Sequence, residues 1–199
     1  PEKIDSVFDL IVKNSNNLNS LNYKNSEIKL NFLSDIYNLI QRTNPNCSLN
    51  DILSKAHDEL VKKNSEPEKA IINFKKIEKK FRLSFEKKNN TILRNYFLNE
   101  ILGHAQVFTN EVPNCRNRFY LTILCSIISK LITIGTISEK SKDLDSQILI
   151  NAIQKVAKNF GVFVLVDSNH EYEFHPEIYS ALRRIDKKSI FNSLFLLFS

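Results

Sequence analysis

The sequence predicts an all-α fold: an irregular bundle of about eight or nine helices with one β-hairpin near residues 162–174. Three features support this fold class. The 199 residues include only three glycines and five prolines, too few for the many turns of an all-β protein. Apolar residues recur at intervals of three and four, the spacing of one helix face. Residues 161–175 depart from this spacing with a β-branched run, a polar turn and an alternating run.

A short helix over residues 3–13 and a polar linker to residue 25 are expected to precede a helical domain over 26–199. Ser26 is a candidate helix cap, and Ser65, Pro67 and Glu68 form a strong start signal for a helix to about residue 88. The remaining helices are expected at 48–61, 91–108, 117–134 with Gly135 as its stop, 141–160 with a left-handed Gly161 at its end, 176–184 and 187–198.

The segment 117–134 is apolar around about 200° of a helical wheel, wider than the face of a surface helix. Its apolar run is about 16 residues long, short of the ~20 that span a bilayer. We therefore expect the central helix of the bundle and no transmembrane segment.

Composition also bears on location and partners. The formal net charge of +6 admits an anionic partner such as nucleic acid or acidic lipid, although such a charge also suits a solubilising surface. Three widely spaced cysteines, Cys47, Cys115 and Cys125, indicate a reducing compartment, and no signal peptide opens the chain. The sequence predicts an intracellular protein, cytoplasmic or nuclear. The apolar end of the chain favours a domain of a larger protein.

The helix expected at 68–88 carries a basic stripe opposite its apolar face. This stripe could contact phosphates, or it could lie on an anionic membrane with the three phenylalanines of the helix inserted. The alternative is an ordinary solvated face. Aromatic residues do not alternate with the lysines, which disfavours single-stranded nucleic acid. The candidate residues for an anionic partner are Lys75, Lys76, Lys79, Lys80 and Arg82.

Residues 141–185 are arranged as a helix followed by a hairpin, the order of a winged helix. The polar side of the helix carries Asn, Gln and Lys, residue types that can reach base edges. The hairpin, however, carries Asp167, Glu171 and Glu173, which phosphates would repel. A protein-binding surface or a purely structural hairpin therefore suits these charges better than DNA.

Two further groups could carry chemistry. Glu100 and His104, four residues apart on one helix, could act as an acid–base pair, but a mutually satisfied hydrogen bond is the simpler interpretation. The acidic and histidine residues at 170–177 match no known metal-ligand spacing. No glycine-rich nucleotide motif occurs. We predict no catalytic residue, no metal and no cofactor.

The function expected from these features is a non-enzymatic helical domain for protein–protein interaction, a scaffold or adaptor. One alternative is binding of nucleic acid or an anionic membrane through the basic stripe, and a second is an enzyme that uses Glu100 and His104. No oligomeric state is indicated. The candidate residues for a protein partner lie on the terminal helix: Phe191, Leu194, Phe195 and Phe198.

Overall fold

The computed structural model describes residues 22–64, 66–82, 91–96, 98–99, 115–137, 146–166 and 172–198. Within these ranges an antiparallel pair of strands, β1 (Val164–Val166) and β2 (Tyr172–Phe174), accompanies a set of helices, and residues 91–96 and 98–99 are also helical. The prediction of an irregular all-α bundle with a late hairpin is confirmed. The helices are α2 (Asn22–Thr43), α3 (Asn50–His57), α4 (Pro67–Lys80), α6 (Cys115–Thr136), α7 (Ser146–Lys158), α8 (Pro176–Ile185) and α9 (Ile190–Phe198).

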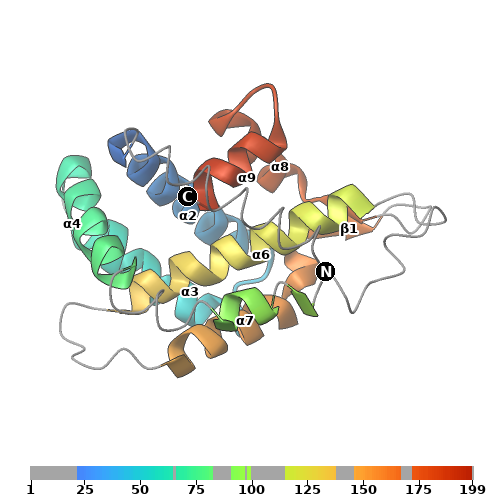
Figure 1. Cartoon of the computed structure of the whole chain (residues 1–199), viewed down its shortest axis with the longest axis horizontal. Coiled ribbons are helices and arrows are strands. Elements are labelled where there is room, and N and C mark those ends of the chain that lie inside the picture. Colours follow the sequence, from blue (N-terminus) through green and yellow to red (C-terminus); the bar gives the residue numbers. More distant parts are fainter. Residues whose placement is uncertain are drawn as a thin grey trace.

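Helix α6 runs through the middle of the bundle (Figure 1). It contacts α2, α3, α4, α7, α9 and strand β2, and every residue from Leu121 to Gly135 is buried. Among the described helices α6 is long and apolar enough to cross a bilayer, but 83% of its window Phe119–Thr136 is buried inside the structure. It is therefore the core helix that its wide apolar face predicts.

The polar residues of α6 are accommodated inside the core by local hydrogen bonds. The hydroxyls of Ser126, Ser129 and Thr133 each donate to the carbonyl four residues earlier, at 2.7–3.0 Å. Lys130 Nζ donates to the carbonyl of Phe198 at 3.3 Å, where the last carbonyls of α9 need donors. These serine and threonine side chains of α6 can thus be buried with their hydroxyls satisfied.

Helix α2 begins earlier than the sequence predicts. It starts at Asn22, and Ser26 lies within the helix with 2% of its surface exposed. The expectation that Ser26 caps the helix is wrong. Packing of the first turns against the rest of the bundle outweighs the preference of serine for a helix start.

Helix α4 begins where expected, with Pro67 in its first turn. Its cap position is occupied by Glu66, which makes no side-chain cap bond, and Ser65 lies outside the described residues. The missing N–H of proline and its fixed φ suit the first helical position by themselves.

Gly135 is not a stop signal either. It lies inside α6, and a Cβ atom at this position would lie 2.6 Å from the Cα and Cβ atoms of Ala56 in α3. The absence of a side chain lets the backbones of α3 and α6 approach closely. Gly135 therefore sets a helix–helix distance rather than a helix end.

The hairpin follows α7 after a short 3₁₀ turn, Phe160–Val162. Gly161 lies in this turn and has no left-handed backbone, so the expected left-handed helix end is wrong. Val164 pairs with Phe174 on the face turned to the core, whereas Leu165 and its partner Glu173 are exposed. The alternation of polar and apolar residues thus positions the strands. A winged-helix character of residues 141–185 stays a prediction.

Candidate functional site

A groove of about 620 Å³ runs between helices α2 and α8. Its floor is apolar and consists of Ile36 and Leu39 from α2 and Ile178 and Ala181 from α8, all with at most 2% of their surface exposed. The polar residues at its edges include Asn38 and Ser180, whose surfaces are exposed. We call this feature the α2–α8 groove.

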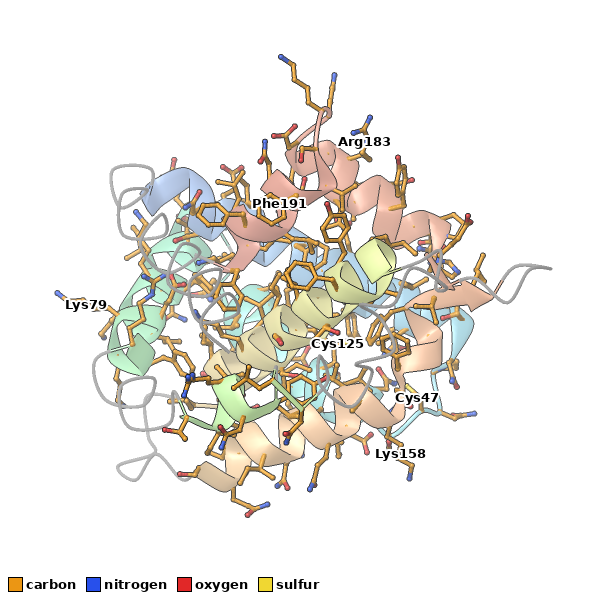
Figure 2. All side chains as sticks on the ribbon, turned by 45° about the vertical axis from the view of Figure 1, so that its right-hand side comes forward. Cys47, Lys79, Cys125, Lys158, Arg183 and Phe191 are labelled. Atoms are coloured by element: carbon orange, nitrogen blue, oxygen red, sulfur yellow. The ribbon has the colours of Figure 1, made fainter. Side chains whose placement is uncertain are left out.

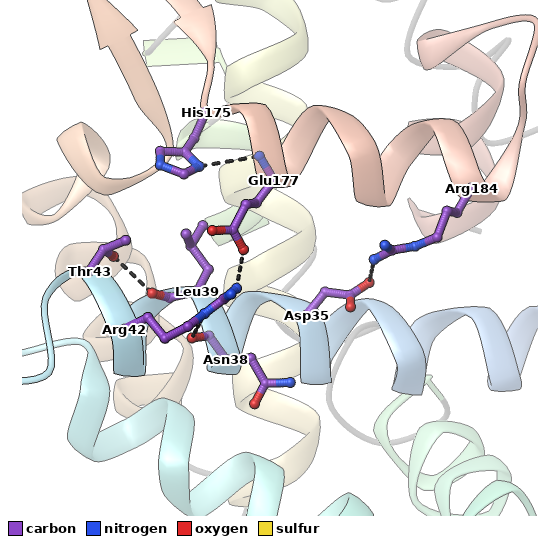
Figure 3. A network of polar contacts seen from close by, with 8 residues as sticks. All are labelled: Asp35, Asn38, Leu39, Arg42, Thr43, His175, Glu177 and Arg184. Atoms are coloured by element: carbon purple, nitrogen blue, oxygen red, sulfur yellow. Dashed lines mark hydrogen bonds and ion pairs between the residues drawn. The ribbon is translucent and has the colours of Figure 1, made fainter.

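Two ion pairs cross the α2–α8 groove (Figure 3). An Arg184 guanidinium nitrogen lies 2.7 Å from Asp35 Oδ2, and the Arg42 guanidinium pairs with Glu177 Oε2. Asp35 and Arg42 are seven residues, about two turns, apart on α2, and so are Glu177 and Arg184 on α8. On both helices the acid precedes the arginine, so opposite charges meet when the two helices run in opposite directions. These four charges therefore match the register in which α8 packs on α2.

Local hydrogen bonds position two of these side chains. Arg42 Nε donates to the carbonyl of Asn38 at 3.2 Å, which holds the guanidinium along α2. His175 occupies the cap position of α8, where its Nδ1 accepts from the backbone N–H of Glu177 at 3.3 Å. His175 thereby serves α8 as a cap, in the segment that the sequence marks as rich in histidine and acids (Figure 3).

Each carboxylate at the α2–α8 groove retains an oxygen that can accept a further hydrogen bond. Asp35 Oδ1 and Glu177 Oε1 accept none from the described residues. A carboxylate oxygen above an apolar floor suits a ligand with a cationic head and an aliphatic stem. The groove therefore combines an apolar floor with two carboxylate oxygens that can accept a hydrogen bond from a ligand.

A second polar cluster lies on another side of α2, around His57 at the end of α3. The rings of His57 and Tyr37 are stacked with centroids 4.3 Å apart, and Lys62 Nζ lies 5.5 Å from the Tyr37 centroid and 2.8 Å from Asp58 Oδ1. Burial, followed by the Lys62 ammonium, lowers the pKa of His57 against the opposing effect of Asp58. A π-helical turn, Asp58–Lys62, begins directly after His57.

The two ring nitrogens of His57 have different surroundings. Nε2 lies 3.3 Å from the Ser34 hydroxyl, which also donates to the carbonyl of Leu30 at 3.1 Å. Nδ1 is buried without a hydrogen-bond partner in the described part of the chain. The cluster holds a neutral imidazole inside the bundle.

A third cluster is buried between α2, α4 and α6. Lys29 Nζ lies 2.7 Å from Glu78 Oε1, with 3% and 12% of the two side chains exposed. Burial lowers the pKa of Lys29 to about 8, partly offset by Glu78. Burial alone would raise the pKa of Glu78, but Lys29 and Arg82 outweigh it and the pKa is lowered. This pair stays charged inside the bundle and holds α4 against α2.

The basic stripe predicted on α4 is present at the surface. Lys76, Lys79 and Lys80 are exposed, Lys75 is half-buried, and Arg82 lies 3.4 Å from Glu78. Phe74 and Phe81, however, have 0% of their surface exposed and pack in the core. The alternative in which the phenylalanines of this helix insert into a membrane is therefore wrong for these two.

The candidate partner residues on α9 are not equally accessible. Phe191 is 40% exposed, Phe195 and Phe198 are half-buried, and Leu194 is buried. The Phe191 ring lies 6.3 Å from that of Tyr120 and 6.4 Å from that of Phe195. Their role in binding a partner stays a prediction, and Leu194 contributes to the core.

Several expected residues lie outside the described part of the chain. Glu100, His104, Asp167 and Glu171 are among them, whereas Glu173 is described and exposed. Within the described residues, no group of three or more His, Cys, Asp or Glu side chains could hold a metal ion.

Comparison with known protein families shows the family to which the chain belongs. A family model described as the FliB lysine N-methylase C-terminal domain matches residues 2–194. The chain belongs to this family. Comparison with curated proteins and with solved structures found no significant match.

Membership of the FliB lysine N-methylase C-terminal domain family overturns the function expected from the sequence. The expectation of a non-enzymatic scaffold, with no enzyme activity, is wrong, because this family comprises domains of a lysine N-methylase. The residues themselves gave no such indication, since no motif of a methyl-donor site or catalytic site stands out. Sequence reasoning also missed the α2–α8 groove. Its only signal was the seven-residue spacing of opposite charges in two distant helices.

Proposed function

We propose that this chain acts in lysine N-methylation as the domain that binds the lysine-bearing substrate, and that the α2–α8 groove receives the lysine side chain. The family match over residues 2–194 is the observation that carries this proposal. An enzyme of this class must recognise an aliphatic stem that ends in an amine. The groove offers both parts of that recognition on one surface.

The stem and the head of lysine would meet different parts of the groove. The four methylenes would lie in the groove, where each CH₂ removed from water contributes up to about 0.8 kcal/mol. The ammonium would donate to Asp35 Oδ1 or Glu177 Oε1, the oxygens left open by the arginine pairs. The arginines would stay in place, so binding requires no separation of α8 from α2.

An intracellular location is part of the same proposal. Among the described side chains, Cys47 and Cys125 are free thiols, which supports a reducing compartment.

The test distinguishes a role of the two carboxylates in substrate binding from a role of the ion pairs in holding α8 against α2. Asp35→Asn and Glu177→Gln remove a carboxylate, whereas Arg184→Gln and Arg42→Gln break the same ion pairs and leave the carboxylate in place. The probe is a short acetylated peptide with one central lysine, with a norleucine peptide as control, titrated by calorimetry. We expect the carboxylate variants to weaken binding about tenfold and the arginine variants to preserve it.

The same variants are then compared in the methylase that carries this domain. The carboxylate variants should raise KM for the lysine substrate and leave kcat within about twofold, since the lost interaction is one of binding. Equal losses in the carboxylate and arginine variants would show that the ion pairs only clamp the helices and would refute the proposal.

A further inference from the structure

The arginines of the α2–α8 groove have hydrogen-bond donors that the ion pairs leave unused. Arg184 donates to Asp35 from Nη2, and its other nitrogens donate to no described residue. Arg42 uses Nε for the carbonyl of Asn38 and Nη2 for Glu177, which leaves Nη1 without an acceptor among the described residues. The side chains of Arg42 and Arg184 are 63% and 64% exposed. The groove therefore offers donors to an anion beside the open carboxylate oxygens.

The charges alternate along both edges of the groove (Figure 3). On α2 Asp35 precedes Arg42, and on α8 Glu177 precedes Arg184, in each case by two helical turns. Two turns span roughly 10 Å along a helix axis. A segment that lies along either edge therefore meets a carboxylate at one end and a guanidinium at the other.

The balance of charge favours an occupant that carries both signs. The two carboxylates and two guanidiniums of the groove sum to zero. A bound lysine adds a positive charge to a site that also holds arginines, and a carboxylate of the same segment restores neutrality when it accepts from the open guanidinium nitrogens. A polyanion such as nucleic acid would instead be repelled by Asp35 and Glu177.

We infer that the α2–α8 groove selects lysines that have an acidic residue nearby in the same polypeptide segment. The ammonium binds the carboxylate at one end of an edge, such as Asp35, and the acid binds the arginine at the other end, such as Arg42. This inference rests on the proposed function and names the class of segment that the groove takes.

The spacing of the two side chains in the segment follows from the length of the edge. Three residues of extended chain span roughly 10 Å, so the acid lies about three residues from the lysine. Because the two helices run in opposite directions, the order of charges is opposite along the two edges. The acid can therefore precede or follow the lysine.

The experiment titrates the 199-residue chain by calorimetry with three acetylated peptides at one salt concentration. The first has a central lysine with glutamate three residues away on each side, the second has glutamine in place of both glutamates, and the third keeps the glutamates but has norleucine in place of lysine. We expect the first peptide to bind about fivefold more tightly than the second, as a contact between exposed charges allows, and the third to bind most weakly.

Protein variants show whether the arginines cause this preference. Arg42→Gln/Arg184→Gln removes both guanidiniums and keeps both carboxylates, so the preference for glutamate over glutamine should vanish. The matched control, Lys79→Gln/Lys158→Gln, makes the same change of net charge at exposed lysines of α4 and α7. These lysines lie on other sides of the molecule from Arg183 of α8 (Figure 2), and the control should keep the preference. Circular dichroism checks that each variant is folded.

Equal binding of the glutamate and glutamine peptides to the wild type would overturn the inference, and this comparison needs no variant. A preference that persists in the arginine variant, or is lost equally in the lysine control, would also overturn it. If neither lysine peptide binds more tightly than the norleucine peptide, the proposed function fails together with this inference. If the lysine peptides bind more tightly but glutamate has no effect, only this inference fails.

Discussion

Helix α2 makes two charged contacts at the same distance but in opposite surroundings. Lys29 lies 2.7 Å from Glu78 of α4 inside the bundle, and Asp35 lies 2.7 Å from Arg184 of α8 at the surface. In the first pair 3% and 12% of the side chains are exposed, in the second 36% and 64%. Water screens the second pair, whereas breaking the first leaves an unneutralised charge in the core. The buried contact therefore belongs to the fold, and the exposed one is open to a ligand.

The largest effect is expected from Glu78→Gln. The change leaves Lys29 buried beside Arg82 and Lys130 with no opposing charge. We expect the free energy of unfolding to fall by about 3–5 kcal/mol, measured by denaturant titration.

The matched control replaces both ends of the pair, as Lys29→Met with Glu78→Leu. Apolar residues of similar volume remove the buried charges together, so most of the stability should return. A loss of under about 1 kcal/mol in Glu78→Gln alone would contradict the distinction between the two pairs.

The contact between Gly135 and Ala56 tests the buried interior with a substitution that changes no charge. Gly135→Ala places a Cβ atom 2.6 Å from the backbone and Cβ of Ala56, so α3 and α6 must move apart. We expect a destabilisation of about 1–3 kcal/mol in thermal or denaturant unfolding. The control, Gly161→Ala, has no atom within 4 Å of the new Cβ and should be nearly neutral. Similar losses in both variants would show that the α3–α6 approach is not limiting.

The pH dependence of the free energy of unfolding tests another buried group, His57. The folded chain lowers the pKa of His57 from 6.5, so the unfolded state takes up a proton first as pH falls. Stability contributed by the neutral ring is present above pH 6.5 and is lost as pH drops toward the lower folded pKa.

His57→Gln retains an amide donor for Ser34 but cannot titrate. Its stability should fall less steeply than that of the wild type between about pH 6.5 and 5, by at most about 1 kcal/mol, in denaturant titrations at each pH. Equal slopes of the free energy of unfolding against pH for the two proteins would contradict the conclusion that His57 is neutral in the folded chain.

The smallest effect on stability is expected at the surface pair. Asp35→Asn and Arg184→Gln should each change the free energy of unfolding by under about 1 kcal/mol, because solvent screens both charges. Only the first should weaken lysine binding. A loss of unfolding free energy as large as that of Glu78→Gln would show that the ion pairs between α2 and α8 stabilise the fold.

Much of the fold could be predicted from sequence because helix spacing is a local property. The apolar period located α6 and marked it as central, and Pro67 and Pro176 marked the starts of α4 and α8. The groove could not be predicted, because Asp35 and Arg184 are 149 positions apart and meet only when α8 lies on α2. The enzyme class was missed for a different reason: the family is recognised across residues 2–194 and not by a short motif.

The sequence by itself determined where helices and strands form, which faces are apolar and that the surface is basic, because each depends on residues within a few positions of one another. Tertiary structure decided what individual side chains do. It turned Gly135 from an expected helix stop into a contact with Ala56, placed Ser26 inside a helix, and directed Glu78 inward while Asp35 faces water. The physical reason is that burial and close approach depend on which helix faces meet, and burial determines whether the same ion pair stabilises the fold or remains available for binding.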